Sequence, residues 1–373
     1  MAKDNHLKEI AGLFLKLGFT AFGGPAAHIA MMQHEVVVKR KWMDEEHFLD
    51  LIGATNLIPG PNSTEMAIHI GYERNGWKGL LTAGLCFILP AVFITGIFAW
   101  FYKQYGQLPE VLPFIYGIKP AIIAIILTAV YPLAKKSFKS IELILAGFTV
   151  LIMGLYGFNE ILLMFGTGIL GMLIKTIRTS GTSLKSFSPL LQIGSTGLIH
   201  ISNVKLFITF LKIGSILYGS GYVLFSFLDT ELVMTGLLSR QQLIDAIAIG
   251  QFTPGPVFSS VTFIGYQMNG LYGAIAATVG IFLPSFLLVA LLNPFIPKMR
   301  TSKWFSAFLD FINAASIAII ISTCYEMGKD SIYDWRTIVI AVLSIIITCT
   351  FKKINSAWVV LGGSLLGYTL YLC

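Results

Sequence analysis

Two Pro-Gly-Pro motifs, each followed by small polar residues, carry the residue types from which an anion-binding site could be built. The motif residues are Pro59, Gly60 and Pro61 in the first copy and Pro254, Gly255 and Pro256 in the second. The polar residues that follow are Asn62, Ser63 and Thr64 after the first motif, and Ser259 and Ser260 after the second. Proline and glycine interrupt a helix, and the helix that starts after them presents unpaired N–H groups with a partial positive charge. Two such helix starts that meet inside a membrane predict an anion site.

The same polar side chains have a second explanation, which is that they cap the helices that follow. Asn, Ser and Thr are common at helix N-termini, where a side-chain oxygen accepts a hydrogen bond from a backbone N–H. A proline at the first helical position needs no function either, because its missing N–H would be unpaired anyway. Since the arrangement occurs at both motifs, we favour the anion site over simple capping.

Two lysines, Lys16 and Lys212, occupy equivalent places in apolar segments. A lysine within the hydrocarbon region is costly and usually marks a pathway or a charged partner, so both are candidates for attracting an anion. Alternatively, each side chain extends to the membrane surface and keeps its ammonium group in water.

Glu65 and His28 are the candidates for coupling transport to protons. Glu65 lies one turn into the helix after the first motif, opposite Ser260 of the second copy, and is either a proton carrier or the counter-ion of Lys16. His28 and His69 lie in apolar stretches and could titrate near neutral pH, although a packed, hydrogen-bonded histidine is the simpler interpretation. The sequence contains no pattern typical of a catalytic triad, a metal cluster or a phosphate-binding loop. We therefore predict no catalytic residues, no metal, no cofactor and no enzymatic activity.

Composition places these residues in a membrane protein. Hydrophobic residues make up 55% of the chain and charged residues only 12%, whereas an average soluble domain has about a quarter charged residues. The mean hydropathy is +0.76, and we predict an all-α, polytopic membrane protein. The net charge of +7 is assigned to cytoplasmic loops, where Lys and Arg concentrate, and not to nucleic-acid binding. The four cysteines have no metal-binding spacing and are expected to pack against neighbouring side chains.

Apolar segments separated by turn residues predict the membrane crossings of the first half. The expected crossings are residues 7–32, 79–102, 112–133, 141–156 and 161–174. The first of them is interrupted by Gly23, Gly24 and Pro25, which we include among the candidate site residues. A helix over 44–57 and a short helix over 62–72 flank the first Pro-Gly-Pro motif. The short helix cannot span about 30 Å of hydrocarbon at about 1.5 Å per residue.

The second half of the chain repeats the motifs of the first. Residues 14–18 (FLKLG) match 210–214 (FLKIG), the break at 22–26 (FGGPA) matches 218–222 (YGSGY), and Asp50 matches Asp245. Several unlike motifs at nearly constant offsets indicate an internal duplication. We predict one repeat over residues 1–180, a polar linker over 181–204 and a second repeat over 205–373.

The loop charges indicate that the two repeats have opposite orientations. The basic run at 39–41 (KRK) corresponds to 233–237, which contains no basic residue, whereas Lys298, Arg300 and Lys303 correspond to a stretch with Lys103 alone. Because basic loops mark the cytoplasmic side, the copies should form an inverted-topology repeat, an architecture of secondary transporters. Each Pro-Gly-Pro motif should then lie at the tip of a re-entrant hairpin, and one hairpin should enter from each side of the membrane.

The motifs FGGPAAHIAMM and LIPGPNSTEMAIHIGY in the first half, and QFTPGPVFSSVTFIGYQMNG in the second, resemble those of the chromate ion transporter family in its long, two-domain form. The similarity covers both halves, and Ser220 departs from it where a third glycine is expected. The resemblance implies export of the chromate dianion across the bacterial inner (plasma) membrane, with chromate resistance as the result and sulfate as a chemical mimic. The expected partners are the lipid bilayer, an oxyanion and, as an option left open, a second copy in a homodimer.

Two other functions are compatible with the residues alone. A transporter for sulfate, another anion, a cation or an organic acid could use the same broken helices. A membrane-embedded enzyme or scaffold is disfavoured because no reactive constellation is visible. The residues themselves predict an inverted-repeat transporter with an anion-binding centre, and chromium enters only through the resemblance.

Overall fold

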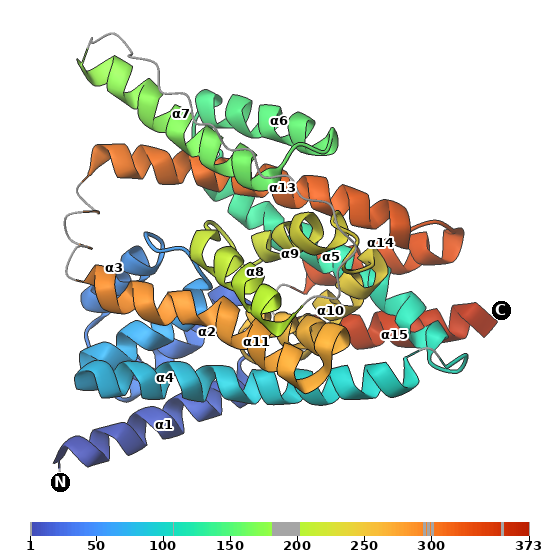
Figure 1. The fold of residues 1–373 in the computed structure, drawn as a ribbon, viewed down its shortest axis with the longest axis horizontal. Coiled ribbons are helices and arrows are strands. Elements are labelled where there is room, and N and C mark those ends of the chain that lie inside the picture. The colour runs from blue at the N-terminus through green and yellow to red at the C-terminus, as the bar shows by residue number, and fades with distance from the viewer. Residues whose placement is uncertain are drawn as a thin grey trace.

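The computed structural model describes residues 2–372 except 107, 181–201, 294–295, 297–298, 300–301 and 352–353, and every regular element in these ranges is a helix (Figure 1). The first half contains α1 (Ala2–Thr20), α2 (Pro25–Gln33), η1 (His34–Lys39), α3 (Glu45–Thr55), α4 (Asn62–Tyr105), α5 (Leu112–Ser137), α6 (Ile141–Leu155) and α7 (Glu160–Ser180). The second half contains α8 (Asn203–Ile216), α9 (Val223–Leu228), η2 (Asp229–Val233), α10 (Arg240–Phe252), η3 (Val257–Ser259), α11 (Ser260–Leu292), α13 (Lys303–Ser331), α14 (Trp335–Thr350) and α15 (Ser356–Leu372). Elements η1 and η2 are π-helical and η3 is a turn of 3-10 helix. The all-α prediction is confirmed.

Side-chain caps explain where several of these helices begin. Ser239 accepts a hydrogen bond from the Gln242 amide at the start of α10, and Asp334 accepts one from the Thr337 amide at the start of α14. At both starts the second side chain also bonds the capping residue's amide, so each is a complete capping box. The helix α4 begins differently, directly after Pro61 and with no side-chain cap.

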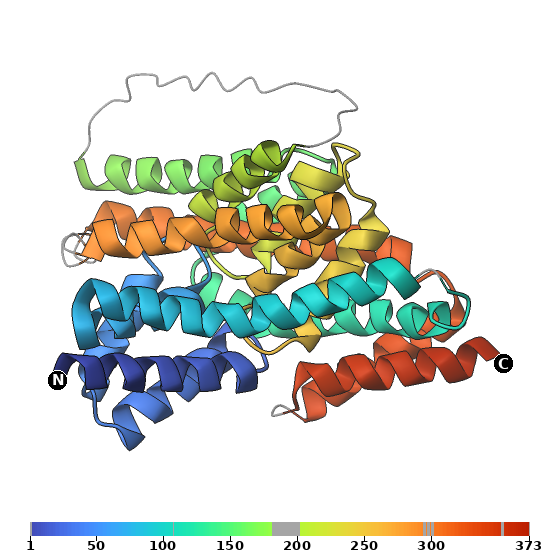
Figure 2. The same cartoon turned by 60° about the horizontal axis from the view of Figure 1, so that its bottom comes forward.

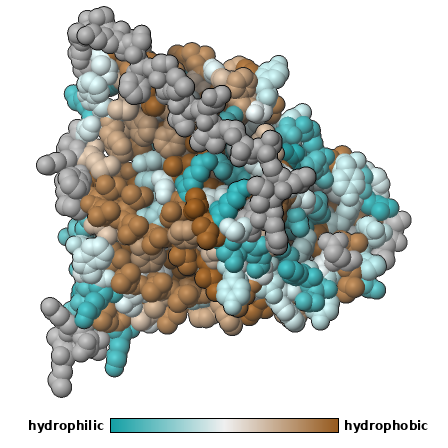
Figure 3. Space-filling model, in the orientation of Figure 1, coloured by the Kyte–Doolittle hydropathy of each residue, from teal (hydrophilic) through white to brown (hydrophobic). Residues whose placement is uncertain are grey.

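Five helices among the described residues are long and apolar enough to cross a membrane. They are Asn62–Tyr105, Leu112–Ser137, Glu160–Ile177, Val257–Leu292 and Lys303–Ser331. Large apolar side chains such as Phe93 and Ile141 are exposed on the outside, and Figure 3 shows hydrophobic side chains covering the left and centre of one face. A soluble protein rarely exposes so much apolar surface, whereas lipid covers it at no cost. The chain is a multi-pass membrane protein.

The two long helices that follow the Pro-Gly-Pro motifs reverse direction near their starts. Non-helical backbone angles mark the reversals at Asn75 and Gly76 in α4 and at Asn269 and Gly270 in α11. A methyl group on Gly79 would lie 2.0 Å from the carbonyl oxygen of Gly71, although these residues would be about 12 Å apart in a straight helix. The residues before each reversal therefore form a short leg that folds back on the long span. With α3 or α10 as the other leg, each short leg forms the predicted re-entrant hairpin.

Corresponding helices of the two halves run in opposite directions. The helices α4 and α11 lie side by side, and Figures 1 and 2 show that their long spans point opposite ways. The neighbours α5 and α13 are related in the same manner, while α1 packs on α4 as α8 packs on α11. The molecule is therefore an inverted-topology repeat. The predicted linker falls almost entirely outside the described residues, as do Lys298 and Arg300, so the domain boundaries stay a prediction.

Candidate functional site

Each hairpin tip is hydrogen-bonded to the broken leading helix of the other half. The backbone amide of Gly60 donates to the carbonyl oxygen of Leu217 over 2.7 Å, and the amide of Gly255 donates to the carbonyl oxygen of Ala21 over 2.8 Å. Ala21 and Leu217 each lie five residues after the equivalent lysines Lys16 and Lys212, so the two bonds are counterparts in the repeat. The two halves are thus interlocked at their four interruptions, which we call the junction: residues 21–25, 59–61, 217–222 and 254–256.

The two leading-helix breaks also face each other within the junction. A methyl group on Gly24 would lie 3.3 Å from the hydroxyl oxygen of Tyr222, and one on Gly221 would lie 3.7 Å from the Pro25 ring. Gly23 and Gly24 have positive φ angles of 101° and 82°, a region that glycine alone enters without strain. Ala21 and Gly24 of this break are buried, whereas Gly23 lies at the protein surface.

Both tip glycines are required by backbone angle and by space. The φ angles are 139° at Gly60 and 90° at Gly255. A Cβ on Gly60 would lie 2.2 Å from Glu65 Oε1 and 2.8 Å from Ser285 Oγ, while a Cβ on Gly255 would lie 2.8 Å from Ala91 Cβ. Glycine lets the backbone approach these groups closely, which a backbone-lined ligand site requires.

The first tip is bordered by a buried acid that forms no ion pair with any lysine, arginine or histidine in the described part of the chain. Glu65 is 0% exposed, and neither of its carboxyl oxygens has a hydrogen-bond partner among the described residues. Ser63, Thr64 and Ser285 around it are equally buried, and the Thr64 and Ser285 hydroxyls also lack partners there. Buried polar groups are normally hydrogen-bonded, so this cluster has free capacity for a proton, a water molecule or a ligand.

The second tip is bordered by hydroxyl groups instead of an acid. Thr95 Oγ1 in α4 lies 3.4 Å from Thr253 Oγ1 and 3.3 Å from Ser259 Oγ, and all three residues are buried. Ser260, the counterpart of Glu65, is buried with an unpartnered hydroxyl. The counterpart of Ser285 is Ala91, since each directly follows the proline of a Leu-Pro pair. The two tips are thus alike in backbone and different in chemistry.

The polar residues after the motifs do not act as helix caps. The residues that precede α4 and η3 are Pro61 and Pro256, and neither helix start has a side-chain cap. Asn62 donates from its amide nitrogen to the Asn56 amide oxygen over 3.0 Å and so ties the two legs of the first hairpin together. The capping alternative is wrong for both tips, and the role of these residues in binding an anion stays a prediction.

The two buried histidines are packed but not hydrogen-bonded. His28 and His69 are each 1% exposed, and no ring nitrogen of either has a partner among the described residues. The ring of His28 lies edge-on to Phe87, with 5.7 Å between centroids. His69 follows Glu65 by one helical turn on α4, which places the two side chains on one face of the short leg.

The two predicted lysines form matching ion pairs away from the tips. Lys16 Nζ lies 2.6 Å from Glu35 Oε1, and Lys212 Nζ lies 2.6 Å from Glu231 Oε1. Both lysine side chains are partly exposed, at 52% and 41%. The Lys16 ammonium, which hydrogen-bonds the Glu35 carboxylate, holds the pKa of that carboxyl below its usual range. The idea that Glu65 is the counter-ion of Lys16 is wrong, because Glu35 occupies that place.

Three charged or polar residues outside the predicted site, Tyr102 of α4, Lys119 of α5 and Asp245 of α10, meet where first-half helices pack on the second hairpin. Tyr102 donates its hydroxyl to Asp245 Oδ2 over 2.5 Å, and Lys119 Nζ lies 4.0 Å from Asp245 Oδ1. The cationic partner of Asp245 thus lies inside the membrane helix α5 and not in a loop. The available signal was Lys119 itself, a single charge within the apolar run of 112–133.

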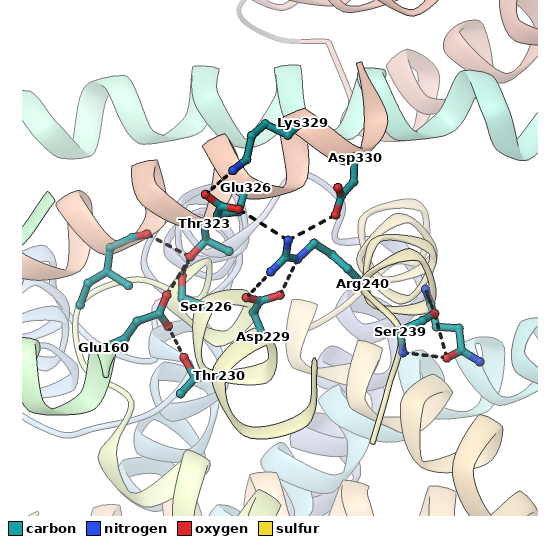
Figure 4. Close-up of polar contacts among 12 residues, drawn as sticks. Glu160, Ser226, Asp229, Thr230, Ser239, Arg240, Thr323, Glu326, Lys329 and Asp330 are labelled. Atoms are coloured by element: carbon teal, nitrogen blue, oxygen red, sulfur yellow. Dashed lines mark hydrogen bonds and ion pairs between the residues drawn. The ribbon is translucent and has the colours of Figure 1, made fainter. Parts of the chain in front are cut away.

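A separate polar network ties the second hairpin to α13 (Figure 4). Arg240, the first residue of α10, lies 3.1 Å from Asp229, 3.3 Å from Asp330 and 3.6 Å from Glu326. Beside it, Glu160 accepts hydrogen bonds from Thr230 and Thr323. Figure 4 shows Arg240 reaching between η2 and α13. The charged groups drawn in this network pair with one another, so we assign it a structural role and not a role in ligand binding.

Comparison with known proteins supports one family. The sequence profile of the family described as Chromate transporter matches residues 8–172 and 204–368, one match in each half. The chain is 30% identical to the "Chromate transport protein" of Cupriavidus metallidurans, with 98% of this chain and 93% of that protein aligned. It is 29% identical to the "Probable chromate transport protein" of Synechococcus elongatus, over 91% and 89% of the two chains. It is 24% identical to the "Chromate transport protein" of Pseudomonas aeruginosa, over 97% and 92%. No solved structure matches the chain.

Proposed function

This chain belongs to the chromate transporter family and is a membrane transporter of that type, and from this premise we propose that it exports the chromate dianion across the cytoplasmic membrane and so confers chromate resistance. The observation that carries the proposal is the pair of crossed hydrogen bonds, Gly60 to Leu217 and Gly255 to Ala21. These bonds bring two uncapped helix starts and their hydroxyl groups into one junction, in which the tip residues 59–61 and 254–256 are buried. A tetrahedral dianion has four oxygen acceptors, which suit backbone N–H groups and hydroxyls that converge from several sides.

We propose that the anion site consists of the junction residues together with the polar residues after each tip. Its members are Gly23, Gly24, Pro25, Pro59, Gly60, Pro61, Asn62, Ser63, Pro254, Gly255, Pro256, Ser259 and Ser260. Lys16 and Lys212 have a smaller role in this proposal, because Glu35 and Glu231 offset most of their charge. They contribute a long-range positive field and do not contact the anion.

We propose Glu65 as the proton carrier, with His28 as its assistant. Burying a carboxylate without a cation is very costly, so Glu65 is stable in its observed place when it carries a proton. The buried ring of His28 has both nitrogens free to receive a proton or pass one on. Only the first tip has such an acid, so one proton site serves the pair of tips.

The membrane potential supports the outward direction. Moving one elementary charge through 100 mV is worth about 2.3 kcal/mol, so a dianion leaving a cell that is negative inside gains about twice that amount. Inward transport of the same ion would need several coupled cations. Export therefore requires no strong coupling, and a proton that Glu65 carries inward in exchange for the dianion adds to the driving force. A homodimer stays a prediction.

The test is flux measured with purified protein in proteoliposomes. Labelled chromate, sulfate and phosphate should be compared with and without a pH gradient. Saturable chromate flux that sulfate competes with is the expected result. A second candidate, sulfate or another oxyanion as the natural substrate, is equally compatible with these donors, because backbone amides and hydroxyls do not distinguish tetrahedral dianions of similar size. Flux of a cation or an organic acid alone would contradict the proposal.

A further inference from the structure

Lys119 of α5 is a membrane-embedded cation with an incomplete partner. Its side chain is only 17% exposed, and the ion pair that it forms among the described residues is a loose contact of 4.0 Å to Asp245 Oδ1. That oxygen makes no hydrogen bond of normal geometry among the described residues, although Asp245 is buried and the Gln241 side chain lies near it. A buried cation is usually paired and hydrogen-bonded, since desolvation makes an unsatisfied charge costly. The arrangement therefore leaves a place for a further anionic ligand.

The contrast with the other lysines in apolar segments is clear. Lys16 and Lys212 each hold a carboxylate at 2.6 Å and are partly exposed. Lys119 is more buried and its carboxylate is farther away. Tyr102 meanwhile satisfies the other oxygen of Asp245 with a hydrogen bond of 2.5 Å. Asp245 can therefore keep one good partner when Lys119 turns away from it.

The position of this cluster relates it to the junction. Tyr102 lies seven residues after Thr95 on α4, which is two turns or about 10 Å along the same helix face. Thr95 in turn contacts the hydroxyls of Thr253 and Ser259 at the second tip. Gln251, two residues before Thr253, is buried with an unpartnered amide nitrogen. A line of polar groups thus leads from the second tip to Lys119.

The other half has no such line. Counted from the prolines Pro90 and Pro284, the counterparts of Thr95 and Tyr102 are Val289 and Ile296. Both belong to an apolar cluster at the first hairpin, which also contains Leu57 and Ile58. The positions that carry polar side chains next to the second hairpin tip therefore carry packed apolar side chains next to the first hairpin tip. Chance burial of one lysine does not explain why both Thr95 and Tyr102 replace apolar residues on the same helix face.

We propose that Lys119 is a cation that binds the oxyanion at a site next to the junction, beyond the second hairpin tip and beside Tyr102. Asp245 pairs with Lys119 while this site is empty. The arriving dianion replaces Asp245 as the partner of the ammonium group, and the Tyr102 hydroxyl stays on Asp245. The ligand class is a tetrahedral oxyanion, for which chromate and sulfate are the probes. This inference rests on the proposed function only for the identity of that ligand.

The test compares three variants: Lys119→Gln, Asp245→Asn and the two combined. Km for chromate and the thermal shift produced by sulfate should be measured on purified protein. Lys119→Gln should raise Km about tenfold or more, as loss of a charge-assisted contact does, and remove most of the thermal shift. If Lys119 only neutralises Asp245, the double variant should regain affinity, because neither group is then left uncompensated. We expect no such recovery.

Two further measurements complete the design. Lys139→Gln combined with Asp310→Asn removes an exposed ion pair of 3.4 Å elsewhere on the molecule and should leave Km unchanged. Lys119→Arg keeps the charge and should retain more affinity than Lys119→Gln. Recovery of wild-type Km in the Lys119→Gln/Asp245→Asn protein would overturn the assignment of Lys119 while leaving chromate transport intact. A wild-type protein that neither binds nor moves any oxyanion would instead overturn the proposed function, and with it this inference.

Discussion

The amide of Gly60 donates its hydrogen bond to the carbonyl oxygen of Leu217, 157 positions later in the chain, and so fixes the first hairpin tip to the break in the second half's leading helix. Its counterpart, from Gly255 to Ala21, does the same in the other direction. In each half, the carbonyl oxygen at the break of the leading helix is hydrogen-bonded by the tip of the other half. A movement of either tip would break its bond or shift the opposite leading helix, so the two bonds couple the halves of the repeat.

The first prediction concerns the tip glycines. Gly60→Ala and Gly255→Ala should each abolish chromate resistance in cells while the protein still reaches the membrane. Each adds a methyl group at a positive φ, which costs about 1 kcal/mol, and each also forces a contact closer than 3 Å. Gly60→Ala should be the more harmful, because the group displaced is the Glu65 carboxyl.

The matched control for the glycine variants is Gly157→Ala. Gly157 also has a positive φ, of 79°, but a methyl group there would meet nothing within 4 Å. This variant should keep resistance after the same loss of backbone freedom. Normal resistance in a Gly60→Ala/Gly255→Ala double variant would mean that the tips are ordinary turns and that the anion binds elsewhere.

The second prediction concerns Glu65. Glu65→Gln preserves shape and removes only the ability to exchange a proton. We expect chromate flux in proteoliposomes to lose its dependence on a pH gradient, while chromate binding measured at equilibrium changes less than threefold, or roughly 0.6 kcal/mol. Flux that still responds fully to the gradient would exclude Glu65 as the proton carrier and would direct attention to His28 and His69.

The third prediction is a pH dependence of stability at the Lys16–Glu35 pair. Pairing lowers the pKa of Glu35 in the folded protein relative to the unfolded chain. The pair therefore stabilises the protein at neutral pH, and this contribution is lost as the pH falls below the ordinary carboxyl value of about 4.3. Thermal unfolding should show a steeper loss of stability between about pH 5 and pH 3 in the wild type than in Glu35→Gln. Identical profiles would show that the pair contributes nothing.

The fourth prediction tests the inverted topology in a membrane. Lys41 and Thr235 are both exposed and lie at corresponding places in the two repeats. Single cysteines at these positions, in a protein whose four native cysteines are replaced, should react with a membrane-impermeant thiol reagent from opposite sides. Labelling of both from one side is incompatible with halves that run in opposite directions.

The local features of this fold were predictable from sequence. Glycine and proline at 23–25, 59–61 and 254–256 act through their own backbone chemistry, so the breaks and hairpin tips could be located without a structure. The inversion was also predictable, because loop charge reports the side of the membrane. What the sequence did not contain is the pairing of breaks from different halves, which depends on how helices pack across the repeat.

The side-chain partners were the harder part. Lys16 was recognised as costly, but its partner Glu35 lies nineteen positions away on a separate element, beyond the reach of helical spacing. Lys119 was overlooked although it is as isolated in its apolar helix as Lys16 is. Its counterpart in the second half is not a lysine, so the comparison of repeats that singled out Lys16 and Lys212 passed over it. A charged residue in an apolar helix is as informative when it occurs in one repeat only as when it occurs in both.

The most direct measurement is the position of the ion itself. An experimental structure determined with chromate bound, with chromium located by its anomalous scattering, would place the anion independently of any model of transport. We predict a chromium peak in the junction, between Gly60 and Gly255 and within hydrogen-bonding reach of Ser259. Occupied chromium sites that all lie outside the junction, at concentrations that saturate transport, would contradict the account.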